Sequence, residues 1–201
     1  MSSQFREERP RGRPRSFDEA ALIDTVTDLF WRKGFAGTSL SDLTDATGAA
    51  RASFYKLYGD KEALLARALG TYADRFHARV DATLAKGLSP REAVAETLTA
   101  SADRLADPDA PNGCLRCRTT LEQPEPRADV AAALDRANGG FVMQMERLLT
   151  GDGNPTPRDR QRALALTAAV NGMVVLAEAG ADRGALQAVI DATLDAVFPP
   201  A

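Results

Sequence analysis

Residues Thr38–Leu64 read TSLSDLTDATGAARASFYKLYGDKEAL, and this stretch decides the fold. Apolar residues recur at helical spacing over 40–46, and Gly48 follows, a residue type that commonly ends helices. A second short helical pattern covers 50–57, and Asp60 precedes the start of a third helix. Two short helices joined by a turn of three or four residues are typical of a helix-turn-helix, whose second helix enters the major groove of DNA. The stretch therefore predicts a DNA-binding element.

Side chains that can contact DNA are concentrated in and before this stretch. Arg51 and Ser53, on the second short helix, can reach base edges, so we assign base reading chiefly to them. Lys61 lies at the start of the third helix, where backbone amides favour phosphate. The predicted DNA-binding residues are Arg13, Arg15, Thr38, Ser39, Arg51, Ala52, Ser53, Tyr55, Lys56, Tyr58 and Lys61.

Residues 34–64 resemble the DNA-binding domain of the TetR family of bacterial transcriptional repressors. That family follows roughly the pattern T-S-x-x-D-L/I-A-x-x-x-G-V-S-x-G-S/T-L/F-Y-x-H/Y-F-x-S/D-K-E-x-L. This chain departs from it at Ala49, Ala50 and Tyr58. Ala50 replaces the Ser or Thr that caps the second helix, which costs about 1 kcal/mol of local helix stability. The resemblance implies double-stranded operator DNA as a partner.

The first 15 residues carry five arginines among Pro and Gly, with no apolar run. They are therefore not a secretory signal peptide. We predict a flexible basic arm over 1–15, and two interpretations are open: a solvated tail, or an arm that lies along phosphates or in a minor groove. The formal net charge of the whole chain is −3, so the positive charge needed for DNA is local.

The remaining sequence predicts an all-α protein of about nine helices in two domains. Hydrophobic residues make up 44% of the chain but aromatic residues only 6%, and apolar residues recur at helical spacing. Ser39, Ser89 and Thr156 open capping boxes. The helix expected around Phe141 contains a Gly139-Gly140 pair that would kink it or admit a ligand. We place the helix-turn-helix domain at 16–62 and an effector-binding and dimerisation domain at 63–201.

The last two helices are predicted to form a dimer interface. Residues 163–177 carry no charge, but this run is too short and too Ala-rich to span a membrane. A helix that is apolar on most sides must be buried. The resemblance implies that these helices pair with those of a second copy in a four-helix bundle, while completion of a monomer core is the alternative. We expect a cytoplasmic homodimer with no membrane contact.

Cys114 and Cys117 form a C-x-x-C motif and are the only cysteines. Structural zinc normally takes four ligands, so no metal site is predicted. Two alternatives are open: a pair of inert thiols, or a redox or electrophile sensor, because helix N-termini and nearby arginines lower thiol pKa values. The Gly-Cys-Leu here resembles a TetR subgroup in which these residues open the sixth helix.

The resemblance also implies a small-molecule effector pocket within the C-terminal domain. Its predicted lining is mostly apolar, which suits a lipophilic compound. The predicted effector-binding residues are Tyr72, Phe76, Leu98, Leu105, Cys114, Phe141, Met145, Val170, Asn171 and Met173. No catalytic or cofactor-binding motif is present, so we predict no enzymatic activity and no cofactor. An α-helical enzyme or carrier with a vestigial DNA-binding domain is a further alternative.

Overall fold

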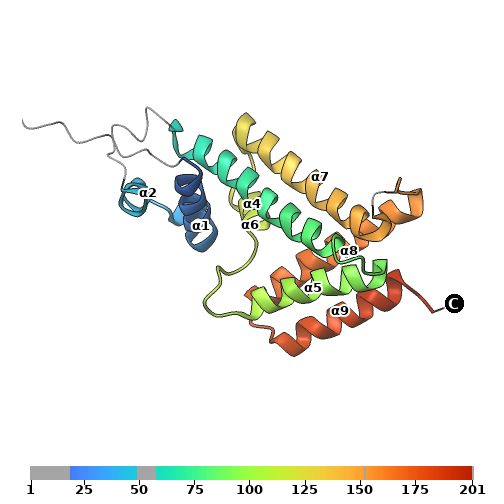
Figure 1. Cartoon of the computed structure of the whole chain (residues 1–201). Coiled ribbons are helices and arrows are strands. Elements are labelled where there is room, and N and C mark those ends of the chain that lie inside the picture. Colours follow the sequence, from blue (N-terminus) through green and yellow to red (C-terminus); the bar gives the residue numbers. More distant parts are fainter. Residues whose placement is uncertain (1–18, 49–57, 152, 201) are drawn as a thin grey trace, which may run out of the picture.

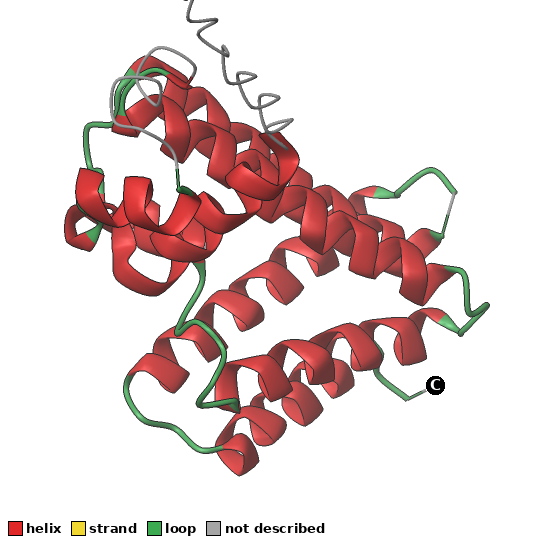
Figure 2. Cartoon of the chain, turned by 60° about the vertical axis from the view of Figure 1, so that its left-hand side comes forward, coloured by secondary structure: helices red, strands yellow, loops and turns green. Residues whose placement is uncertain are grey.

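The computed structural model describes residues 19–48, 58–151 and 153–200, and every regular element within them is an α-helix (Figure 2). The all-α prediction is confirmed, while the helix expected at 50–57 lies outside the described residues. The helices are α1 (Glu19–Gly37), α2 (Leu40–Thr47), α4 (Lys61–Leu84), α5 (Pro90–Ala106), α6 (Leu115–Glu122), α7 (Ala128–Thr150), α8 (Pro157–Glu178) and α9 (Arg183–Val197).

Three of these helices begin at the predicted capping boxes. Ser39 caps α2, Ser89 caps α5 and Thr156 caps α8, and in each box the side chain of the third helical residue accepts a hydrogen bond from the cap amide. These bonds satisfy donors that have no partner inside the helix. Gly48 ends α2 in the left-handed conformation, with φ 65°, as its position in the sequence predicts.

Helix α4 connects the two parts of the molecule (Figure 1). We call residues 19–48 and 58–62 the head, and residues 63–200 the body. Helix α4 packs against α1 of the head and along α7 of the body, while α8 packs against α7 and α9, and α5 against α9. The core of the head extends into α4 as far as Leu69 and includes Leu115 and Leu134. The domain boundary at residue 62 stays a prediction.

The Gly139-Gly140 pair does not kink α7, which runs without interruption from Ala128 to Thr150. The predicted kink is absent because packing against α4 supports the helix along its length, while the alternative, that the pair admits a ligand, stays a prediction. A Cβ atom on Gly140 would lie 3.1 Å from Nε2 of His77. The missing side chain therefore lets the imidazole of α4 lie against α7.

Helix α8 is not buried on all sides in the single chain. Leu164, Val175 and Leu176 expose 57%, 62% and 41% of their surface. These side chains form an apolar surface on the outer side of α8, which a single copy of the chain leaves open to water. No helix among the described residues is long and apolar enough to cross a membrane.

Candidate DNA-binding and effector sites

Two residues predicted to contact DNA are buried in the head. Thr38 is fully buried, and its hydroxyl donates a 2.6 Å hydrogen bond to the Gly34 carbonyl. Tyr58 is 7% exposed within the core of the head. Their predicted side-chain contacts with DNA were wrong, because the Thr38 hydroxyl is bonded to α1 and the Tyr58 ring packs in the core of the head.

Ser39 and Lys61 remain accessible at the ends of helices. The Ser39 hydroxyl accepts a hydrogen bond from the Asp42 amide and donates one to the Asp42 carboxylate. The Lys61 ammonium lies 4.3 Å from the centre of the Phe35 ring. The remaining predicted DNA-binding residues lie outside the described residues: Arg13, Arg15, Arg51, Ala52, Ser53, Tyr55 and Lys56.

A carboxylate of the chain itself already occupies the start of α4. Asp60 accepts a hydrogen bond from the Ala63 amide at 2.9 Å and pairs with Arg127, whose Nη2 lies 2.9 Å from its Oδ1. The bond from Arg127 is the main cause that lowers the pKa of Asp60. The predicted phosphate site at this helix end is therefore partly filled, and the same contact ties the head to the start of α7.

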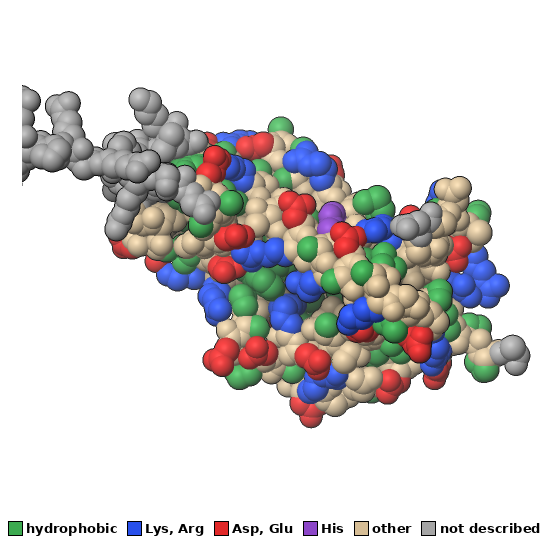
Figure 3. Space-filling view, in the orientation of Figure 1, with side chains coloured by type: hydrophobic (Ala, Val, Ile, Leu, Met, Phe, Trp, Pro, Cys, Tyr) green, Lys and Arg blue, Asp and Glu red, His purple; other side chains and the backbone are tan. Residues whose placement is uncertain are grey.

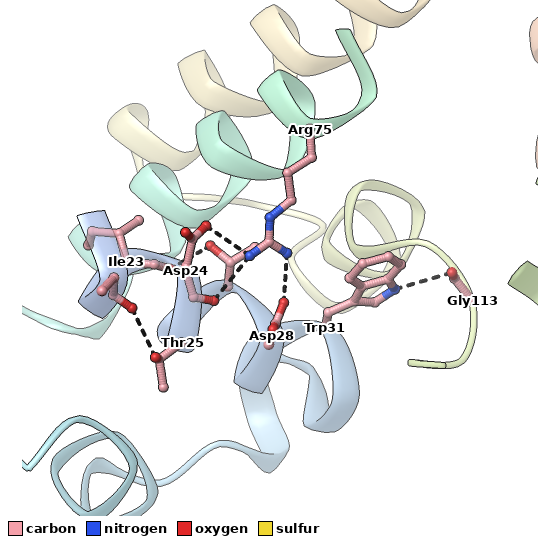
Figure 4. Close-up of polar contacts among 9 residues, drawn as sticks. Ile23, Asp24, Thr25, Asp28, Trp31, Arg75 and Gly113 are labelled. Atoms are coloured by element: carbon pink, nitrogen blue, oxygen red, sulfur yellow. Dashed lines mark hydrogen bonds and ion pairs between the residues drawn. The ribbon is translucent and has the colours of Figure 1, made fainter. Parts of the chain in front are cut away.

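Helix α1 of the head is held by polar contacts to the body on two sides (Figure 4). Arg75 on α4 pairs with Asp24 and Asp28 at 2.9 and 2.6 Å. The Trp31 indole donates a 3.2 Å hydrogen bond to the Gly113 carbonyl, just before α6. Movement of α4 or of the start of α6 therefore acts directly on the head.

The far end of α6 also holds the head. Glu122, the last residue of α6, accepts a 2.7 Å hydrogen bond from the Phe35 amide. Arg118, one turn earlier, donates to the Trp31 carbonyl at 3.1 Å. Hydrogen bonds therefore join α1 both to the residue before Cys114, at the start of α6, and to the last residue of α6.

A pocket lies in the body between α4, α5, α6, α7 and α8, and we call it the central pocket. The empty space between its walls is about 580 Å³, a figure that includes its opening to solvent. It is lined by Tyr72, Ala73, Phe76, His77, Arg79, Ser101, Arg104, Leu105, Cys114, Arg116, Ala137, Phe141, Val170 and Val174. Figure 3 shows Lys and Arg side chains around a hollow with hydrophobic groups inside it.

Six of the ten predicted effector-binding residues line the central pocket: Tyr72, Phe76, Leu105, Cys114, Phe141 and Val170. Leu98, Met145 and Met173 do not, because they are almost completely buried in the core of the body. Asn171 is not in the wall of the pocket either, but its Oδ1 accepts a 2.7 Å hydrogen bond from Arg116.

The sequence prediction missed the charged residues of the pocket, Arg79, Arg104 and Arg116. Arg79 follows Tyr72 by seven residues and Phe76 by three, so helical spacing alone places it on the same face of α4. The predicted lining included only uncharged residues of that face. The positions of Arg104 and Arg116 depend on how α5 and α6 pack.

The two cysteines have different environments in the wall of the pocket. Cys114 is buried at the start of α6, and the Tyr72 hydroxyl donates to its sulfur at 3.4 Å. A hydrogen bond from Cys117, together with Arg116 and Tyr72, lowers the pKa of Cys114 well below the ordinary thiol value. The same hydrogen bond and burial raise the pKa of Cys117. Cys114 is therefore the thiol that ionises first.

No group of three His, Cys, Asp or Glu side chains in the described part of the chain is placed to hold a metal ion. The site instead consists of a DNA-binding head, a pocket in the body and polar contacts between them. These features define an all-α DNA-binding regulator.

Comparison with known proteins gives the family. A family model described as "Bacterial regulatory proteins, tetR family" matches residues 22–68. The HTH-type transcriptional repressor ComR of Escherichia coli (strain K12) is 32% identical over 192 residues, which cover 92% of this chain and 90% of that protein. The chain belongs to the TetR family of DNA-binding transcriptional regulators.

Solved structures agree with this assignment. A cysteine-substituted variant of the TetR family regulator CifR, complexed with 26-base-pair operator DNA, is 28% identical with a TM-score of 0.75, and the match covers 93% of this chain and 100% of that one. The reduced form of NemR from E. coli has the same fold, with 21% identity, a TM-score of 0.74 and coverage of 87% and 93%.

Proposed function

We propose that the protein is a homodimeric repressor that binds operator DNA and is released when a small molecule occupies the central pocket. One observation carries this proposal: residues in the wall of the pocket touch the head. Tyr72 packs edge-on against Trp31 of α1, with ring centroids 4.8 Å apart. Trp31 also donates to Gly113, the residue before Cys114. A ligand that displaces Tyr72 or the start of α6 therefore shifts α1.

We propose separate residues for base contacts and for phosphate contacts. Arg51 and Ser53 would read bases, while Tyr55, Lys56 and Lys61 would contact phosphates. Exposed Ser39 would take the place of buried Thr38 among the phosphate contacts. The arginines of the arm would add further phosphate or minor-groove contacts.

The outer side of α8 supports the proposed dimer. Small or apolar residues are exposed at helical spacing along it, namely Leu164, Ala168, Gly172, Val175 and Ala179. Exposed alanines on α9 continue this surface at residues 185, 188, 192 and 196. Small residues let two helices approach closely, and a second copy would supply the same surface across a two-fold axis. Two heads in one dimer match the two half-sites of a palindromic operator.

Operator binding is tested by fluorescence anisotropy on the DNA upstream of the protein's own gene, with scrambled DNA of equal length as control. We expect nanomolar, sequence-preferring binding by a dimer. Arg51→Ala should relax sequence preference at a cost of about 1–3 kcal/mol, whereas Lys61→Ala should weaken binding to all DNA and reduce the salt slope. Equal binding to both DNAs, with the same salt dependence, would contradict a specific regulator acting at this site.

The coupling between pocket and head has its own test. Trp31 is the only tryptophan of the chain, so its fluorescence reports the junction between α1 and α6. We expect one spectral change when operator DNA binds and a different change when a pocket ligand releases it. Trp31→Phe, which loses the hydrogen bond to Gly113, should weaken the effect of the ligand on operator affinity.

A thiol-based sensor is the second candidate, supported by the ionisable Cys114 beside Cys117. The Cys114 thiolate would attack one oxygen of a peroxide, breaking the O–O bond and forming a sulfenic acid with release of hydroxide or alkoxide. Condensation with the Cys117 thiol would then form a disulfide and release water. Operator anisotropy with peroxide tests this: Cys114→Ser should abolish release, and a Cys114→Ser protein that still responds would refute the candidate.

A further inference from the structure

The central pocket contains three guanidinium groups, and no carboxylate is among the described residues that line it. Arg79, Arg104 and Arg116 come from α4, α5 and α6 and meet in its wall. Within the described part of the chain, none of the three forms an ion pair, although thirteen other pairs of basic and acidic groups lie within 4.0 Å. No acidic residue lines the pocket. The pocket therefore holds an excess of positive charge.

Arg116 is the most buried of the three, at 7% exposure. Its Nη1 and Nη2 donate to the side-chain oxygens of Asn138 and Asn171, which are neutral, at 2.6 and 2.7 Å. Its Nε is buried without a hydrogen-bond partner, as is Nε2 of His77. A buried charge that only neutral groups solvate is costly, and an anion nearby lowers that cost.

Arg79 and Arg104 lie nearer the opening of the pocket. Arg79 makes no hydrogen bond to a described residue, and its guanidinium lies 5.5 Å from the centre of the Phe76 ring. Its side chain is exposed, at the rim of the pocket. Among the described residues, Arg104 donates a hydrogen bond only to the neutral carbonyl of Pro111, at 3.2 Å, and its guanidinium lies 4.9 Å from the centre of the Trp31 ring. Both side chains retain donors for a ligand.

Arg75, on the same helix as Arg79, has carboxylate partners and serves as a comparison. It lies one turn before Arg79, pairs with two carboxylates of α1, and does not line the central pocket. Arg79 therefore differs from Arg75 in having no carboxylate partner among the described residues and in lying in the wall of the pocket.

The rest of the lining is apolar and suits a flat or branched hydrocarbon group. The Phe76 and Phe141 rings stack with centroids 4.5 Å apart and an interplanar angle of 24°. Leu105, Val170 and Val174 complete this side of the pocket. A ligand that fills the space has to meet both the apolar surface and the three cations.

We propose that the effector of the central pocket is an amphipathic organic anion, with a carboxylate that pairs with Arg79 and Arg104 and an apolar body that packs against Phe76 and Phe141. The positive charge of buried Arg116 also attracts the carboxylate. Arginine favours carboxylates because its donors match the two oxygens in a fork. This inference rests on the proposed function, since it names the chemical class of the effector, and it adds a negative charge to the lipophilic compound that the sequence suggested.

The Cys114 thiolate does not remove the need for a ligand anion. One thiolate beside Arg116 balances one of three positive charges, and Cys114 lies at the start of α6, where it also accepts from Tyr72. Two cations remain without a counter-ion in the described residues.

The test compares two probes that differ in charge but hardly in shape, 2-naphthoate and 2-naphthamide. Isothermal titration calorimetry of each with the full-length protein should show naphthoate binding at least tenfold more tightly. Arg79→Gln and Arg104→Gln should each weaken naphthoate about 10- to 100-fold and leave naphthamide unchanged. Arg75→Gln removes a charge from the same helix outside the pocket and should change neither affinity more than about twofold.

The outcomes separate this inference from the proposed function. Equal affinity for the two probes, or equal losses in Arg79→Gln and Arg75→Gln, would overturn the anion inference. Operator binding of the ligand-free protein is measured in parallel by anisotropy. Sequence-preferring operator binding with no preference for naphthoate would leave the regulator intact and refute the anion, whereas the reverse result would refute the regulator and retain the anion site.

Discussion

Replacing Gly34 with alanine should destabilise the protein in two ways: by straining the backbone and by breaking a hydrogen bond. Gly34 has φ 73° and ψ 172°, a conformation that is essentially restricted to glycine. A Cβ atom there would overlap Oε1 of Glu122 and lie 3.0 Å from its Cδ. Glu122 would have to move, and its 2.7 Å hydrogen bond from the Phe35 amide would be lost.

The expected magnitude is the sum of these two effects. A side chain in this backbone region costs about 1–3 kcal/mol. Loss of a hydrogen bond to a partly exposed carboxylate costs about 1 kcal/mol. We therefore expect Gly34→Ala to lower the free energy of unfolding by about 2–4 kcal/mol.

Urea unfolding at a fixed protein concentration measures this change, because the proposed dimerisation would make stability depend on concentration. The matched control is Gly37→Ala on the same helix, where the added Cβ would meet only the Lys33 Cβ at 3.8 Å. We expect that control to change stability by less than about 0.5 kcal/mol.

A double-mutant cycle identifies the cause. Glu122→Ala alone should cost about 1 kcal/mol, and the double variant should lose about 1 kcal/mol less than the sum of the single variants. Additive losses would show that the added Cβ does not act through Glu122. A Gly34→Ala protein as stable as the parent would refute the backbone argument as well.

Three further outcomes are expected. Hydrogen bonds from Lys33 and Ser39 lower the pKa of Asp42. The ionised Asp42 carboxylate therefore stabilises the folded protein fully above about pH 4, and this contribution is lost as the pH falls further. The free energy of unfolding of Asp42→Asn, measured in urea, should depend less on acid pH than that of the parent protein. Cys117→Ala removes the donor that lowers the pKa of Cys114, so the pH midpoint of Cys114 alkylation by iodoacetamide, followed by mass spectrometry, should rise; an unchanged midpoint would contradict this cause. Val175→Asp should yield monomers in sedimentation velocity, whereas Leu121→Asp, which also alters an exposed apolar residue, should remain dimeric.

Most of the fold could be predicted from the sequence because its determinants are local. Ser39, Ser89 and Thr156 each bond to an amide three residues later, and Gly48 ends α2 by its own conformation. The family pattern identified the DNA-binding head for the same reason, since its residues lie within one short stretch of chain.

Tertiary structure decided which polar residues are available to a partner. The pattern cannot show that Thr38 bonds to Gly34 inside the head, or that Tyr58 lies in its core. Both residue types contact DNA when exposed, and only the packing of α1 against α2 and α4 determines their burial.

The charge of the pocket likewise depends on the tertiary structure. Arg79, Arg104 and Arg116 come from three helices, and whether an arginine is paired depends on carboxylates distant in the sequence, as with Arg75 and Asp28. The contact between Phe35 and Glu122 joins residues 87 positions apart. The sequence by itself determined the helices and the family, because those depend on neighbouring residues; the unpaired cations and their link to the head arise only where separate helices meet.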